Sequence, residues 1–90
     1  MADIRAEIDA IDHQVVALIG KRAGYVAAAS KFKTSQSSVQ APERQKAMLQ
    51  QRREWAEQEG LSPDVIEQMY RDLVAYFVGE ELDKWRKENG

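Results

Sequence analysis

The sequence predicts an all-α protein in which one long N-terminal helix is followed by a loop and two shorter helices. Two observations support this prediction. Apolar residues recur three and four positions apart in three segments, and residues that favour helix starts and ends stand between those segments. No segment alternates in the way a half-buried strand does. With 90 residues, 43% of them hydrophobic and 31% charged, the chain has the size and composition of one small domain, residues 1–90.

The first helix is predicted over residues 3–33, with Asp3 as its N-cap. Its apolar residues follow an alternating four-three spacing, which is typical of a helix that packs against other helices. We call this row of apolar positions the seam. Its position between Leu18 and Tyr25 is occupied by Arg22, and a buried guanidinium needs an anionic partner. The apolar members of the seam are Ile4, Ile8, Ile11, Val15, Leu18, Tyr25, Ala29 and Phe32.

The length of this helix indicates a homodimer. A helix of ~30 residues is about 45 Å long, whereas a compact 90-residue monomer has a radius of gyration of about 12 Å. The helix would then extend beyond its own domain with an exposed seam, and a second copy of the chain is the usual cover. The competing interpretation is a monomer whose first helix breaks near Gly20 or Gly24.

The second helix is predicted to begin at Pro42, which suits the first helical position, and to end at Gly60, which suits the position after a helix. Residues 34–41 before it have turn-type composition and are interpreted as a loop. The second helix carries Met48, Leu49, Arg52, Trp55 and Ala56 on one side.

The third helix is predicted from Ser62 as N-cap and Pro63 as first residue to about Lys87. At ~100° per residue, the apolar face of this helix continues to Glu80 and Glu81. We therefore expect a carboxyl group to point toward the interior of the protein. The apolar face consists of Ile66, Met69, Tyr70, Leu73, Tyr76 and Phe77.

Composition argues against several classes of function. The net charge of −2 argues against a nucleic-acid binder, and the arginine-rich segment 44–53 is interpreted as a solvated face. There is no cysteine and only one histidine, so we expect no metal site. No apolar run is long enough to cross a membrane, and no signal-peptide pattern is present, so we expect a cytoplasmic protein.

Three cations form the candidate binding site. Arg22 and Lys33 are 11 residues apart and share a helix face, about 16 Å apart along the axis. Arg5 lies 17 residues before Arg22, or about 25 Å, so it reaches the same ligand only from a second, antiparallel chain. Alternatively, Arg5 and Lys33 are solvated helix-end cations, and Arg22 pairs with Glu80 or Glu81.

The chain resembles a known family along nearly its whole length. The matching residues are Asp3, Ile4, Arg5, Ile8, Asp9, Ile11, Asp12, Lys21, Arg22, Tyr25, Val26, 30–33, 41–44, 47–49, Arg52, 55–57, Gly60, Leu61, Glu80, Trp85 and Arg86. In these residues the sequence is similar to the all-helical AroQ class of chorismate mutases. It most resembles the isochorismate pyruvate lyase branch, which makes salicylate for siderophore biosynthesis.

The resemblance implies an intertwined homodimer and a pericyclic reaction that needs no cofactor and no metal ion. It implies that Arg22 and Lys33 come from one chain and Arg5 from the other. Arg5 and Arg22 match arginines that bind the carboxylates of a dicarboxylate enol ether, isochorismate or chorismate. Lys33 matches the lysine that contacts a carboxylate and the ether oxygen.

The sequence departs from the family pattern at two positions. Glu81 stands where glutamine often donates a hydrogen bond to the ether oxygen, and a carboxyl group donates only when protonated. We therefore hypothesise that Glu81 works in its protonated form and that activity falls as pH rises; the alternative is that Glu81 turns outward and Lys33 acts alone. Pro42 replaces a usual arginine, so Glu43 is left out of the expected site.

Three functions follow in order of preference. The first is an isochorismate pyruvate lyase with chorismate mutase side activity. The second is a dedicated chorismate mutase of phenylalanine and tyrosine biosynthesis, and the third is a non-catalytic helical dimerisation module. The sequence does not distinguish the two substrates except through resemblance to one branch.

Overall fold

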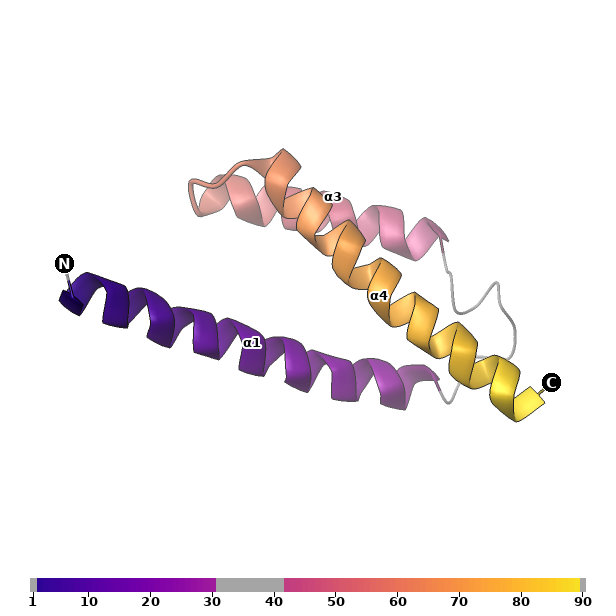
Figure 1. Ribbon diagram of the computed structural model, residues 1–90. Coiled ribbons are helices and arrows are strands. Elements are labelled where there is room, and N and C mark those ends of the chain that lie inside the picture. Colours follow the sequence, from indigo (N-terminus) through magenta and orange to yellow (C-terminus); the bar gives the residue numbers. More distant parts are fainter. Residues whose placement is uncertain (1, 31–41, 90) are drawn as a thin grey trace. The chain divides into compact units, whose positions relative to one another are not determined.

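The computed structural model describes residues 2–30 and 42–89, and within these ranges the chain is all-α (Figure 1). It consists of α1 (Ala2–Ser30), α3 (Pro42–Gln58) and α4 (Pro63–Asn89). These are the long helix and the two further helices that the sequence predicts. The predicted loop at 34–41 lies outside the described residues. Two compact units contain the helices: α1 belongs to one, and α3 and α4 belong to the other.

The long helix α1 is continuous over 29 residues. The alternative in which it breaks near Gly20 or Gly24 is therefore wrong. The prediction for Asp3 needs a correction, because α1 begins at Ala2 and Asp3 lies inside its first turn. A negative charge is still favourable there, since the N-terminal end of a helix carries unpaired N–H groups and a partial positive charge.

The second helix ends at Gln58, two residues before the predicted end, and Gly60 takes the predicted role of the glycine that follows a helix. The Leu61 N–H donates to the Ala56 carbonyl at 2.8 Å, and the Gly60 N–H donates to the Glu57 carbonyl at 3.1 Å. This is the Schellman arrangement, in which the residue after the helix adopts a left-handed backbone conformation. Gly60 has a φ of 74°, and glycine is suited to it because it has no Cβ.

The start of α4 also follows the sequence prediction. The Ser62 hydroxyl accepts a hydrogen bond from the Val65 N–H at 3.3 Å, which is the N-cap contact, and Pro63 is the first helical residue. The helix continues to Asn89, two residues beyond the predicted end at Lys87. The tight connection at 59–62 makes α3 and α4 a helical hairpin.

The hydrophobic core of the described chain is small and lies in this hairpin, where α3 packs against α4. Three side chains are buried, Leu49 and Ala56 from α3 and Phe77 from α4. Within the predicted apolar face of α4, Met69 and Tyr76 remain more than half exposed. The prediction of this face is therefore confirmed only for the side chains that contact α3.

The apolar seam of α1 is exposed in the single chain. Its large members within residues 2–30 have exposed fractions between 45% for Val15 and 70% for Tyr25, and Phe32 lies outside the described residues. A helix with this many exposed apolar side chains needs a further surface against which to pack. None of the helices in the described ranges has an apolar stretch long enough to cross a lipid bilayer.

Candidate functional site

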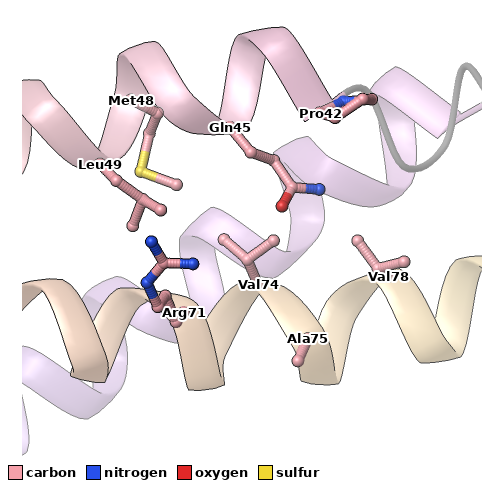
Figure 2. Close-up of a pocket in the computed structure, with 8 residues that line it drawn as sticks. All are labelled: Pro42, Gln45, Met48, Leu49, Arg71, Val74, Ala75 and Val78. Carbon is pink, nitrogen blue, oxygen red and sulfur yellow. The ribbon is translucent and has the colours of Figure 1, made fainter.

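A cavity of about 330 Å³ lies between α3 and α4 (Figure 2). Its walls are mostly aliphatic, and the side chains of Gln45 and Arg71 add polar groups from opposite helices. Its size is at the lower end of the range for small-molecule sites. The lining residues are Pro42, Gln45, Met48, Leu49, Arg71, Val74, Ala75 and Val78.

The predicted site residue Glu81 is close to this cavity along α4. Val74, Val78 and Glu81 are spaced by four and three residues, which places them on one face of the helix. Glu81 is half-buried. The face that lines the cavity therefore continues to a carboxyl group one turn further on.

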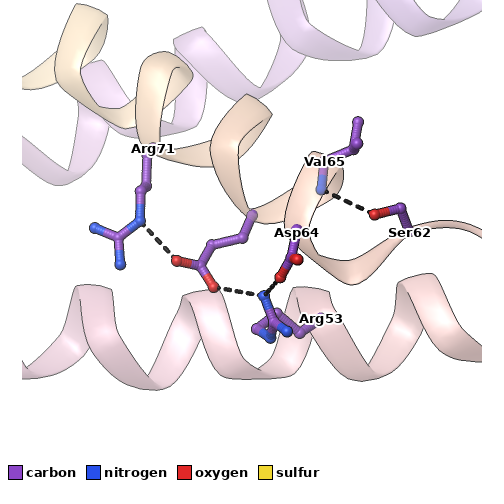
Figure 3. A network of polar contacts seen from close by, with 6 residues as sticks. Arg53, Ser62, Asp64, Val65 and Arg71 are labelled. Atoms are coloured by element: carbon purple, nitrogen blue, oxygen red, sulfur yellow. Dashed lines mark hydrogen bonds and ion pairs between the residues drawn. The ribbon is translucent and has the colours of Figure 1, made fainter.

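An ion-pair network joins the two helices of the hairpin near its turn (Figure 3). Arg53 donates to Asp64 at 2.8 Å and to Glu67 at 2.9 Å, and the Arg71 Nε donates to Glu67 at 2.8 Å. The hydrogen bonds from Arg71 and then Arg53 lower the pKa of Glu67, and those to Asp64 and Glu67 raise the pKa of Arg53. Glu67 thus links an arginine of α3 to the arginine that lines the cavity.

A second arginine of α3 is held by aromatic rings. The Arg52 guanidinium carbon lies 4.5 Å from the centre of the Trp55 ring and 5.4 Å from that of Tyr70. Its Nε is shielded from water and has no hydrogen-bond partner within the described chain. Such stacking replaces part of the hydration that the cation loses.

These contacts correct the interpretation of segment 44–53 as a solvated face at two positions, whereas Arg44 and Lys46 of the same segment are exposed as expected. Arg52 and Arg53 are both half-buried against α4. The sequence offered one clear signal for this network, since Glu67 and Arg71 are four residues apart on one helix, a spacing at which opposite charges pair. The pairing of Arg53 across the turn depends on the angle between the helices, which sequence spacing does not give.

The predicted cations fall outside the hairpin. Arg5 is exposed in the second turn of α1, and Arg22 is half-buried further along the same helix. Lys33 lies outside the described residues. Glu43, which we left out of the expected site, is exposed in the first turn of α3.

The sequence offers Glu80 as one alternative ion-pair partner of Arg22. Its carboxylate accepts a hydrogen bond from the hydroxyl of Tyr76, and this contact raises the pKa of that tyrosine.

Among the residues described, no group of three or more histidine, cysteine, aspartate or glutamate side chains is arranged to hold a metal ion.

A family model, chorismate mutase type II, matches residues 4–82 of the chain. The chain belongs to the chorismate mutase type II family. The resemblance inferred from the sequence is thereby confirmed, and this family member is an enzyme of the pericyclic chorismate mutase type.

Curated relatives agree with this membership. The chain is 41% identical over its full 90 residues to the isochorismate pyruvate lyase of Pseudomonas aeruginosa, of which it covers 89%. It is 42% identical over 75 residues to the T-protein of Haemophilus influenzae and 34% identical over 82 residues to that of Enterobacter agglomerans. It spans only 20% and 22% of the lengths of those two proteins.

Proposed function

We propose that the protein is an isochorismate pyruvate lyase that converts isochorismate into salicylate and pyruvate, with chorismate mutase side activity. The observation that carries this proposal is the 41% identity to a relative of that name along the full chain. In the reaction the ether C–O bond breaks, a ring hydrogen moves to the methylene carbon of the departing enolpyruvyl group, and the ring becomes aromatic. All atoms come from the substrate, so the reaction consumes no co-reactant.

Catalysis by this protein would consist of positioning and charge stabilisation. Arg22 and Arg5, the latter from the partner subunit, would bind the two carboxylates through their planar guanidinium groups. Lys33 would contact a carboxylate and the ether oxygen, where negative charge develops. The aliphatic walls of the α3–α4 cavity suit the substrate ring, because they offer it apolar contacts and no nucleophile.

We propose that Glu81 donates a hydrogen bond to the ether oxygen in its protonated form. Its half-buried position, one turn beyond Val78, supports this role. Activity should then fall as pH rises, because the ionised carboxylate is an acceptor only. The Glu81→Gln variant carries a permanent donor, so its rate should change much less with pH. A rate for the unsubstituted protein that is flat between about pH 5 and pH 8 would contradict this role.

We also propose that the whole chain, residues 1–90, acts as a single domain in an intertwined homodimer. The exposed seam of α1 supports this arrangement, since a second copy would cover it. The same arrangement would bring Arg5 of one subunit to the site of the other.

The deciding experiment compares kcat/KM of the purified protein for isochorismate and for chorismate. We expect salicylate and pyruvate from isochorismate with the higher kcat/KM. Efficient formation of prephenate from chorismate without salicylate from isochorismate would instead identify a dedicated chorismate mutase. That second function is favoured by the family description itself.

A non-catalytic dimerisation module would turn over neither substrate. It would also show no thermal stabilisation by a dicarboxylate analogue of the substrate, whereas a substrate site predicts that the melting temperature rises with analogue concentration.

A further inference from the structure

The ion pairs of Figure 3 lie next to one end of the α3–α4 cavity. The α4 residues that line the cavity begin at Arg71 and continue through Val74 and Val78, whereas Glu67, one turn before Arg71, does not line it. On α3, the lining residue nearest to the turn is Leu49. Arg71 and Leu49 therefore mark the end of the cavity that is nearer to the hairpin turn.

Arg71 reaches from one helix toward the other at this end. Figure 2 shows its side chain extending from α4 toward Leu49 on α3. Its Nε donates to Glu67 at 2.8 Å, and Glu67 accepts a second bond from Arg53 of α3 at 2.9 Å. The side chain of Arg71 is 56% exposed, whereas that of Glu67 is 24% exposed. Arg71 is thus held in its orientation by Glu67 and not by burial.

The spacing of α3 and α4 at the cavity depends on such contacts because the core between them is small. Of the three buried side chains in the described chain, Leu49 alone lines the cavity. Apolar contacts have no preferred direction, whereas hydrogen bonds restrict both the distance and the angle between two groups. The contacts of Arg53, Glu67 and Arg71 therefore restrict how far apart the cavity walls lie.

We propose that Glu67 is a positioning residue for the substrate ring. By holding Arg71 at the end of the cavity, it sets the distance between the walls of α3 and α4 that contact the ring. Glu67 acts only through Arg71, since its own side chain does not line the cavity. The inference deepens the proposed function and rests on it for the assignment of the cavity to the ring.

The kinetic test compares Glu67→Ala with the unsubstituted protein. The walls contact the ring in the ground state and in the transition state alike, so a change in their spacing weakens the binding of both. We therefore expect KM to rise about 5-fold or more and kcat to stay within about 2-fold. Glu67→Gln keeps one acceptor oxygen and should give a KM between these two. A purely structural role would lower the folded fraction, and hence kcat, at an unchanged KM, and that result would overturn the inference.

Asp64→Asn is the matched control. Asp64 accepts a 2.8 Å bond from the same Arg53, but it is 88% exposed and does not line the cavity. Its loss should leave KM within about 2-fold of the unsubstituted value, because an exposed ion pair contributes little. An equal rise of KM in Asp64→Asn and Glu67→Ala would overturn the inference, since loss of any ion pair near the turn would then have the same effect.

A double variant tests whether Glu67 acts through Arg71. Arg71→Ala alone should raise KM about as much as Glu67→Ala does. The variant with both substitutions should raise KM no further, because the second substitution removes a contact that is already absent. Effects that multiply in the double variant would show that the two residues act independently and would overturn the inference.

Failure of the proposed function has a separate signature. A protein that converts neither isochorismate nor chorismate refutes that function, and the cavity walls are then followed by methyl NMR of the full-length protein. Glu67→Ala should shift the methyl signals of Leu49 and Val74, and Asp64→Asn should leave them in place. Unchanged signals in Glu67→Ala, or equal shifts in both variants, would overturn the positioning role of Glu67.

Discussion

Replacing Leu18 by alanine tests whether the exposed seam of α1 is a subunit interface. Leu18 is 62% exposed in the single chain, and Leu49 in the hairpin core is 8% exposed. The same chemical change at these two positions therefore compares an uncovered leucine with a buried one. Val16 is a matched control on α1, since it is 66% exposed and lies away from the seam.

The expected magnitudes follow from burial. Leucine to alanine removes three carbon atoms, each worth about 0.8 kcal/mol when fully buried, or about 2.4 kcal/mol in total. At Leu49 we expect a loss of about 2–3 kcal/mol, at the lower end for core leucines, because the site opens onto the existing cavity. At Leu18 the single chain covers less than half of the residue, so the loss without a partner is at most about 1 kcal/mol.

In a homodimer that covers the seam, Leu18→Ala should cost about 2–3 kcal/mol per subunit, similar to Leu49→Ala. The difference of about 1–2 kcal/mol between the two cases corresponds to a shift of roughly 5–15 °C in melting temperature for a domain of this size. Val16→Ala should change stability by less than about 0.5 kcal/mol in either case.

The assay is thermal unfolding followed by circular dichroism at two protein concentrations, combined with sedimentation equilibrium. For a dimer the melting temperature rises with protein concentration, and Leu18→Ala should shift the equilibrium toward monomer. Similar small effects of Leu18→Ala and Val16→Ala, together with melting that is independent of concentration, would refute the dimer.

Three further predictions concern other parts of the chain. Arg22→Ala should lower kcat/KM by at least about 100-fold while sedimentation still shows the dimer, because a carboxylate contact is lost; unchanged activity would favour a dimerisation module. The pKa of Glu67 lies below its ordinary value of 4.5, so its ion pairs stabilise the fold above that pH and are lost as pH falls through the lowered value. Between about pH 5 and pH 3, the melting temperature of Glu67→Gln should therefore fall less than that of the unsubstituted protein. The same dependence of melting temperature on pH in both proteins would contradict this prediction. Gly60→Ala should cost about 1 kcal/mol in denaturant unfolding, from backbone strain at a φ of 74°, whereas Gly79→Ala, at a helix-interior glycine, should be neutral or stabilising.

Much of the fold follows from local sequence. Helix starts and ends depend on residues that are close together in the chain, so Pro42, Gly60 and Ser62 identified the bounds of the hairpin helices nearly to the residue. The small error at Asp3 arose because an acidic residue is favourable both as an N-cap and in the first turn. Charged residues within an apolar pattern, together with the family resemblance, identified the candidates for the site, which are Arg5, Arg22, Lys33 and Glu81. The assembly of these residues into one site is a prediction.

Residue patterns along the chain are enough to predict that it is helical and to place the bounds of the two hairpin helices within two residues. These properties rest on spacing and on local hydrogen bonds, whereas the family follows from the matching residues. Three features became visible only in the packed hairpin: which side chains of α4 contact α3, how Arg52 and Arg53 are held, and that Arg71 lines a cavity. The physical reason is that a contact between helices depends on the angle of the turn and the length of each side chain, and residues such as Arg53 and Glu67, 14 positions apart, meet only when the hairpin closes.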